Sequence, residues 1–269
     1  MRRPSPATVR WLILVALLAF WELMPSTKLI PELFLPSLSK TLTVLWSDRH
    51  DYLAALGVTL YEVAVAMLFA CGGGILIGAL VGGLALLRTL FLQVFSSLYA
   101  VPIVILYPIF TAWLGIGSES KIAFAAAYGF FPVMLSTAAG IRTIDPQYLL
   151  AARSMGATLS QQVTRVVIPA SIPTVLTGLR LGGALTIIGV VVAEMLTSAA
   201  GIGYLVTRYR TILDSPRVFA GILMILSLSV LFDVLARMVE RRTLAWQTAG
   251  RRQRKSRDDV QAVPAAAPA

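Results

Sequence analysis

Few side chains in this sequence could catalyse a reaction or bind a metal ion. The 269 residues include one histidine, His50, and one cysteine, Cys71. One thiol cannot close an internal disulfide, and one thiol with one imidazole cannot supply the ligand cluster of a zinc site. The H-E-x-x-H pattern of metalloproteases and the G-x-x-x-x-G-K-[ST] phosphate loop are both absent. We therefore predict no metal site, no cofactor and no catalytic residue, and a chain that needs a partner to use ATP.

Three ionisable residues stand out because they lie near the ends of long apolar runs: Glu194, Asp233 and Arg237. An ionisable group in hydrocarbon costs about 2.5 to 3.5 kcal/mol, so such residues are candidates for function. We predict that Glu194 is a structural anchor or part of a gate, with direct substrate contact as the alternative. Asp233 and Arg237 are four residues apart, which favours an ion pair on one helix face. We predict a structural role for this pair.

Helices that span a membrane would have to position these residues. The chain is 57% hydrophobic and 13% charged, with a mean hydropathy of +0.80. One bilayer crossing needs about 20 apolar residues. Runs close to that length cover residues 11–24, 58–87, 91–114, 122–141, 172–195 and 218–239. The sequence therefore predicts an all-α fold, a polytopic membrane helical bundle of about six transmembrane helices, within one domain over residues 1–249.

The formal net charge of +10 would suggest nucleic-acid binding in a soluble protein. Here the basic residues gather at the chain ends, in residues 2–10 and 241–257. Such an excess marks the cytoplasmic side of a membrane, so we predict cytoplasmic termini and no nucleic-acid partner. The basic tail, residues 250–269, is predicted to be disordered and solvated rather than bound to lipid or RNA. The excess of basic residues on the cytoplasmic side has exceptions here. A predicted outer link contains or adjoins Arg208, Arg210 and Arg217.

Small residues and prolines indicate how the helices pack. Gly74, Gly78 and Gly82 recur every four residues, a spacing that lets two helix backbones approach closely. We predict a contact within the chain, with a dimer seam as the alternative. Pro102 and Pro108 in one run and Pro132 in the next predict kinks, since proline cannot donate a helical hydrogen bond.

The link after residue 144 carries helix boundary signals at short intervals. Asp145 followed by Pro146 supplies a cap and a first-turn proline, and Gly156 can end the helix in the left-handed conformation. Thr158, with Gln161 three residues later, matches the capping box that begins a helix. These signals predict a cytoplasmic helix–turn–helix hairpin over residues 145–170.

The second helix of the hairpin is predicted to be amphipathic. One face carries Leu159, Val163, Val166 and Val167, and the others carry mainly Gln161, Gln162, Thr164 and Arg165. One side can therefore be buried while the other meets water or a partner. Pro169 and Pro173 are predicted to end this helix.

The same segment carries a family signature. The run Ala151-Ala152-Arg153-Ser154-Met155-Gly156-Ala157, with Ile168-Pro169 and Gly178-Leu179-Arg180 beyond, resembles the EAA loop of binding-protein-dependent ABC importer permeases. Further matches extend over most of the chain and are most similar to the nitrate, sulfonate and taurine group. They are Thr59-Leu60, Pro102, Pro108, Gly115-Ile116-Gly117, Phe131-Pro132, Ala193-Glu194, Gly201-Ile202-Gly203 and Asp233. Leu150 departs from the pattern, because the motif begins with glutamate.

The resemblance implies a permease in the inner membrane of a bacterium. It implies a homodimer in membrane lipid, with cytoplasmic ABC ATPase subunits and an extracytoplasmic substrate-binding protein as partners. The hairpin would be the ATPase-coupling element, through Leu150, Ala151, Ala152, Arg153, Gly156, Gln161, Arg165 and Pro169. The implied substrates are small anions such as nitrate, aliphatic sulfonates or taurine, although related permeases carry heterocyclic vitamin precursors.

Other classes of protein fit the sequence less well. An ion-coupled secondary transporter is the main alternative, but paired broken helices and mid-membrane ionisable groups are not evident. An intramembrane enzyme would need a catalytic motif that the sequence lacks. The hairpin could instead lie on lipid as an interfacial element.

Overall fold

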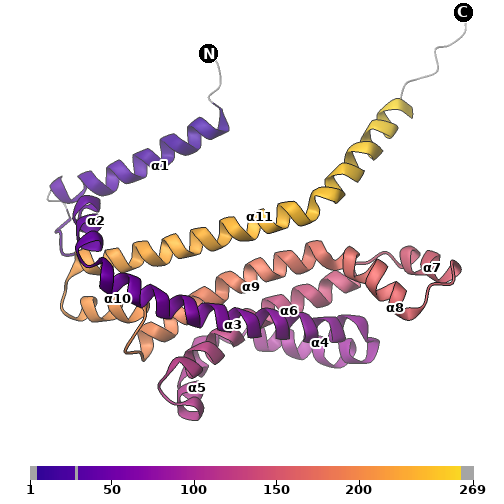
Figure 1. Cartoon of the computed structure of the whole chain (residues 1–269), viewed down its shortest axis with the longest axis horizontal. Coiled ribbons are helices and arrows are strands. Elements are labelled where there is room, and N and C mark those ends of the chain that lie inside the picture. Colours follow the sequence, from indigo (N-terminus) through magenta and orange to yellow (C-terminus); the bar gives the residue numbers. More distant parts are fainter. Residues whose placement is uncertain (1–4, 28–29, 262–269) are drawn as a thin grey trace, which may run out of the picture.

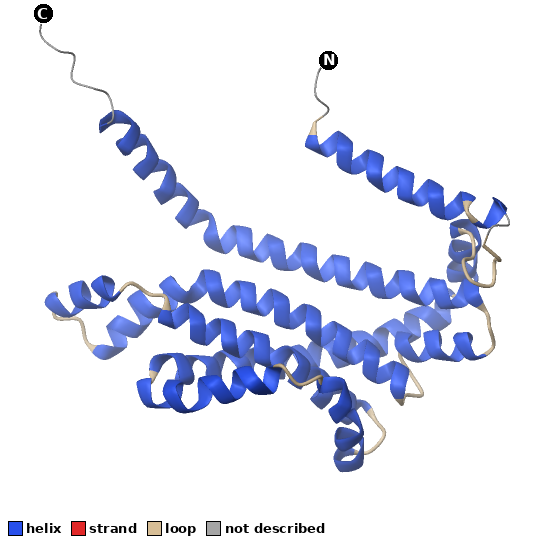
Figure 2. Cartoon of the chain, turned by 180° about the vertical axis from the view of Figure 1, so that it is seen from behind, coloured by secondary structure: helices blue, strands red, loops and turns tan. Residues whose placement is uncertain are grey.

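The computed structural model describes residues 5–27 and 30–261, and every regular element in them is a helix (Figures 1 and 2). The predicted all-α class is confirmed for this part of the chain. The helices are α1 (Pro6–Leu23), α2 (Leu38–Ser47), α3 (Arg49–Gly83), α4 (Ala85–Tyr99), α5 (Tyr107–Leu114), α6 (Ser118–Arg142), α7 (Pro146–Ser154), α8 (Leu159–Gln162), α9 (Ile168–Leu196), α10 (Ile202–Thr211) and α11 (Ser215–Gln261).

Four helical stretches of the described chain are long and apolar enough to cross a membrane: Arg49–Gly83, Ser118–Arg142, Leu159–Leu196 and Ser215–Thr243. A bent pair of helical segments, Ala85–Tyr99 with Ile103–Leu114, raises the number of candidate spans to five if the pair counts as one span. The first apolar run forms α1, which has 18 residues. A membrane bundle of several spans is therefore shown, and the count of six stays a prediction.

The third apolar run is sharply bent, so its single crossing stays a prediction. Its two arms, α4 and the stretch Ile103–Leu114, meet at 88°. Pro102 lies at the break, with a ψ of 99° that is not helical. Proline lacks an amide hydrogen and disfavours a helical conformation in the residue before it, so the chain turns there. By contrast, Pro132 lies inside α6, which continues through it.

The centre of the bundle is formed by α3, α6 and α9. Gly74, Gly78 and Gly82 of α3 all face α6, and a Cβ atom on Gly78 would lie 2.5 Å from the carbonyl oxygen of Met134. On the other side of α6, a Cβ atom on Gly189 of α9 would lie 2.9 Å from the Cα atom of Ala125. The glycine stripe therefore serves packing within the chain, as predicted.

The glycine contact leads to a stability prediction. Gly78→Val should push α3 away from α6 and lower the melting temperature of the purified protein, because overpacking a close contact costs about 1 to 3 kcal/mol. Gly72→Val is the matched control, since Gly72 lies in the same helix and a Cβ atom there would have no neighbouring atom within 4 Å. Equal loss of thermal stability in the two variants would show that the contact with α6 is not the cause.

The two ends of the bundle differ. At one end lie α2, α10, the start of α3 and the start of α11, while α7 and α8 project from the other end (Figure 1). The helix α1 stands apart from the central helices (Figures 1 and 2). We call the end with α10 the α10 end and the opposite end the hairpin end.

The helix α11 continues to Gln261 in the described part of the chain, and the disordered tail over residues 250–269 stays a prediction. Arginine, glutamine and lysine are good helix formers, so the helix can continue past the apolar run. Residues 1–4 and 262–269 lie outside the described part of the chain, and the domain boundary at residue 249 stays a prediction.

Candidate functional site

The hairpin between α6 and α9 has the local structure that its sequence predicts. The Asp145 carboxylate accepts a hydrogen bond from the Gln147 amide at 2.9 Å and caps α7. Gly156 follows α7 with a φ of +75°, which is the left-handed region. Thr158 and Gln161 form a reciprocal capping box, in which the Thr158 amide donates to the Gln161 side chain at 3.0 Å. Side chains that cap backbone amides, together with the left-handed turn at Gly156, therefore set the direction of α8 relative to α7.

A side-chain bridge that the sequence analysis missed joins the two hairpin helices. Arg153 Nε donates to Gln162 Oε1 at 3.2 Å, and Gln162 Nε2 donates to the carbonyl oxygen of Ala157 at 2.9 Å. Gln162 is buried, as is Ala152 beside it. The amphipathic pattern placed Gln162 on a solvent or partner face, so nothing in the periodicity pointed to this role.

Large apolar side chains of the hairpin remain uncovered. Leu159 is 75% exposed and Met155 is 81% exposed, and Tyr148 and Leu150 are also exposed. We call these four residues the hairpin surface. The sequence predicts that the Leu159 face can be buried, and Val166 and Val167 of that face are partly buried. Leu159 and Val163 remain exposed where the hairpin projects beyond the bundle (Figure 1). Exposed apolar groups of this kind mark interaction sites.

The predicted end of the second hairpin helix is wrong. The stretch Leu159–Leu196 is continuous, through a π-helical segment at Val163–Val167 and then α9. The Ile168 amide bonds to the carbonyl oxygen of Val163 in this segment, and Pro169 follows in the first turn of α9. The wider π turn accommodates the missing amide of Pro169, because local π geometry can relieve a lost helical bond. Pro173 lies inside α9.

A second group of polar side chains is buried at the α10 end. Glu62 of α3 and Lys121 of α6 form an ion pair, and both are almost completely buried. Glu62 Oε1 also accepts from Ser118 Oγ at 2.8 Å, and Lys121 Nζ donates to Ser198 Oγ at 3.1 Å. Glu62 Oε2 is buried without a hydrogen-bond partner in the described residues. The sequence pattern does not indicate Glu62 or Lys121 as site residues, and their pairing is what allows both charges to be buried.

Glu194, predicted as an anchor or gate residue, lies in the same region and is 1% exposed. Its Oε1 accepts from Thr59 Oγ1 at 2.7 Å, and its Oε2 accepts from the Gly203 amide at 2.8 Å. The Thr59 hydroxyl also accepts from the Ile202 amide at 3.0 Å. Glu194 therefore ties the end of α9 to α3 and to the first turn of α10. We call Glu62, Lys121, Glu194 and Thr59 the buried cluster.

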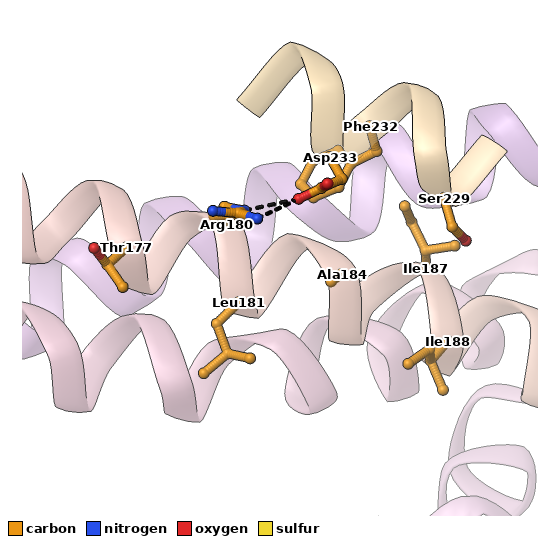
Figure 3. Close-up of a pocket in the computed structure, with 9 residues that line it drawn as sticks. All are labelled: Thr177, Arg180, Leu181, Ala184, Ile187, Ile188, Ser229, Phe232 and Asp233. Atoms are coloured by element: carbon orange, nitrogen blue, oxygen red, sulfur yellow. Dashed lines mark hydrogen bonds and ion pairs between the residues drawn. The ribbon is translucent and has the colours of Figure 1, made fainter. Parts of the chain in front are cut away.

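A third charged group lines a pocket between α9 and α11 (Figure 3). The pocket has a volume of about 480 Å³ and mainly apolar walls, among them Leu181, Ile188 and Phe232. Arg180 Nε donates to Asp233 Oδ1 at 2.8 Å. Asp233 also forms an ion pair with Arg237, as the spacing of four predicts. The Arg180 to Asp233 pair ties α9 to α11 nearer the hairpin end than the buried cluster, while the Asp233 to Arg237 pair lies within α11.

Comparison with known proteins places these features in a family. The model for binding-protein-dependent transport system inner membrane components matches residues 74–245. The taurine transport system permease of Escherichia coli is 30% identical over 242 residues, covering 87% of each chain. The formylaminopyrimidine transport permease of Halalkalibacterium halodurans is 28% identical, covering 92% of this chain and 99% of the relative.

The fold also matches a solved transporter. A chain from an inward-facing MetNI methionine ABC transporter gives a TM-score of 0.63 at 17% identity, covering 72% of this chain and 97% of the other. At that identity the likeness shows the fold alone. The family model and the relatives assign the chain to a family, and the fold agrees with that assignment. The chain belongs to the binding-protein-dependent transport system inner membrane components, which are the permease subunits of ABC importers.

Proposed function

We propose that this permease carries a small anion of the sulfonate, taurine or nitrate class inward, as a homodimer with two cytoplasmic ATPase subunits and an extracytoplasmic binding protein. The hairpin surface is the observation that carries the proposal. Its apolar side chains stand on two capped helices and are exposed, although large exposed apolar residues are unfavourable unless a partner covers them. The partner is the ATPase, whose hydrolysis supplies the energy.

The chemistry of the hairpin surface supports this docking role. Leu150, which stands where the family motif has glutamate, is 65% exposed. It lies on α7 with Tyr148, so the contact is more apolar than a carboxylate would make it. Arg153 is held by Gln162, and Gln161 is held in the capping box. The docking face is therefore preorganised, which reduces the entropy cost of binding.

The helix that leaves the hairpin provides a route for coupling. Leu159–Leu196 is a continuous stretch of 38 residues, with the hairpin at one end and Glu194 at the other. A displacement of the hairpin by closing ATPase subunits would move this helix and strain the hydrogen bonds from Thr59 and Gly203 to Glu194. The permease would then switch between inward-facing and outward-facing states whose populations are set by differential binding.

The orientation follows from the ATPase partner. The hairpin end faces the cytoplasm, so the α10 end faces the extracytoplasmic side, where a binding protein would deliver substrate. Both termini are then cytoplasmic, given six crossings of the inner membrane, in agreement with the basic residues near the chain ends. The similarity to a taurine permease favours a sulfonate-type anion over a heterocycle.

Reconstitution tests the proposal. The purified chain alone should neither bind nor hydrolyse ATP. In liposomes with its ATPase and binding protein, it should hydrolyse ATP and accumulate labelled taurine, ethanesulfonate or nitrate. Nucleotide binding by the isolated chain would contradict the proposal that a separate subunit binds and hydrolyses ATP. If the liposomes accumulate a neutral heterocycle but take up none of taurine, ethanesulfonate and nitrate, the proposed sulfonate, taurine or nitrate substrate class is wrong.

A further inference from the structure

A pocket at the α10 end has no role so far. It has a volume of about 590 Å³ and lies between the end of α9, the face of α10 and Ile116 in the link before α6. Hydroxyl groups line part of it, from Thr197, Ser198 and Thr207, and Arg208 contributes a guanidinium. We call it the outer pocket. It adjoins the buried cluster, because Glu194 and Ser198 belong to both its wall and the hydrogen bonds beneath it.

Arginines on this side of the membrane need a reason, because the positive-inside bias disfavours them. Arg217 has a structural one. Its Nε donates to Asp48 Oδ2 at 2.7 Å, which holds the pKa of that carboxyl below its usual value, and it also pairs with Asp214. Arg208 and Arg210 differ from Arg217, because none of the ion pairs in the described chain includes either of them, and of these two only Arg208 lines the outer pocket. The guanidinium of Arg208 lies 5.8 Å from the ring centroid of Tyr209 and is exposed.

The chemistry of the outer pocket suits an anion. A free guanidinium offers a planar fork of donors that matches the oxygens of a sulfonate, carboxylate or nitrate group. Of the three hydroxyl groups, Ser198 already donates to the carbonyl oxygen of Ala200 at 2.6 Å and Thr207 to that of Met195 at 3.3 Å. Thr197 makes no side-chain hydrogen bond in the described chain, so its hydroxyl can donate to the same oxygens.

Two other charges lie near the outer pocket. Lys121, whose ammonium group donates to Ser198 at 3.1 Å, is already paired with Glu62, so the positive charge open to an anion is that of Arg208. The carboxylate of Glu194 also belongs to the pocket wall, where its two oxygens accept hydrogen bonds from Thr59 and Gly203, so Arg208 must outweigh its repulsion of the anion.

We propose that the outer pocket is the site that first receives the transported anion from the binding protein, and that Arg208 is its specificity-determining residue. The inference rests on the proposed function, since it assumes an anionic substrate. It gives a role to Arg208, which lines the outer pocket without an acidic partner in the described chain. The oxyanion would contact the guanidinium of Arg208 and the hydroxyl group of Thr197.

The neighbouring residue Arg210 offers a matched control. It lies on the same helix and is also exposed, but it does not line the outer pocket. Arg208→Gln and Arg210→Gln therefore remove the same charge from the same surface, and only the first removes a donor from the pocket. Arg208→Lys keeps the charge and loses the planar fork.

The test uses the complete transporter in liposomes with saturating loaded binding protein, and measures anion uptake and ATP hydrolysis together. Arg208→Gln should lower uptake per ATP hydrolysed by about 10-fold, the effect of losing a charge-assisted hydrogen bond. Arg208→Lys should be intermediate and Arg210→Gln unchanged. Stimulation of hydrolysis by the binding protein should persist in all three variants, because docking is intact.

Three results would overturn the assignment of the outer pocket. Loss of stimulated hydrolysis in Arg208→Gln would make this residue a docking contact. An equal loss of uptake in Arg210→Gln would indicate a general surface-charge effect. Unchanged uptake in Arg208→Gln would show that the pocket does not receive the anion. Each can occur while the wild type transports taurine, ethanesulfonate or nitrate, whereas failure of the wild type on all three refutes the proposed function itself.

Discussion

Replacing Gly156 by valine is expected to abolish most ATP-driven uptake while the protein still inserts and folds. Gly156 has a φ of +75°, where a β-branched residue is strained by about 1 to 2 kcal/mol. A Cβ atom at this position would have no neighbouring atom within 4 Å, so the strain comes from the backbone and not from a clash. The turn should relax toward negative φ and change the direction of α8 relative to α7.

The hairpin surface would then be split, because α7 and α8 carry different parts of it. Met155 lies before the turn and Leu159 after it. The Arg153 to Gln162 hydrogen bond, which spans the turn, should also be lost. We expect weaker recovery of the ATPase in copurification, or hydrolysis that no longer drives uptake. The bundle should retain its melting temperature, since α3, α6 and α9 are untouched.

Graded variants separate the backbone effect from other causes. Gly156→Asn should be mildest, because asparagine tolerates the left-handed region, and Gly156→Ala should lie between asparagine and valine. Gly72→Val, in open space on α3, controls for adding valine to the chain. Wild-type uptake and ATPase recovery by Gly156→Val would mean that the turn does not position the docking surface.

The hairpin was predictable because its determinants are local. Asp145 caps the residue two positions on, Thr158 and Gln161 cap each other, and Gly156 needs only its own backbone to end α7. Such signals act within one turn of chain, so sequence spacing is enough to find them.

The prolines show where local signals stop being sufficient. Pro102 lies at a break with an 88° bend, whereas Pro132 and Pro173 lie within continuous helices. The residue type is the same in each case. The outcome depends on whether neighbouring helices or a local π turn, as before Pro169, can accommodate the lost hydrogen bond. That information is tertiary, and the sequence pattern does not contain it.

The buried cluster was missed for a related reason. Glu62 looks like a residue at the start of a membrane helix, and Lys121 looks like the end of an outer loop. Their pairing depends on α3 lying against α6, which only the fold reveals. Glu194 could be flagged from its apolar surroundings alone, but its partners Thr59 and Gly203 come from two other elements. Sequence reasoning found the isolated charge and not the network that accommodates it.

Removing one partner of the buried ion pair should have the largest effect on stability. Lys121→Met leaves the Glu62 carboxylate buried, and Ser118 is then its one side-chain donor among the described residues. Breaking a buried pair in this way costs about 3 to 5 kcal/mol, because the remaining charge is uncompensated. We expect a much lower melting temperature or poor recovery of the purified protein. Glu62→Leu should cause a similar loss, since it leaves the ammonium group of Lys121 with Ser198 alone.

The double variant Glu62→Leu, Lys121→Met distinguishes charge burial from packing. Replacing a buried pair by apolar residues of similar volume is often neutral or stabilising, so the double variant should be more stable than either single variant. Its uptake provides a second readout. If the pair only packs α3 against α6, activity should return with stability. If the pair also holds the α10 end closed in one state, the stable double variant should hydrolyse ATP without proportionate uptake. A double variant as unstable as the single ones would show that the geometry of the side chains, and not their uncompensated charge, dominates at this site.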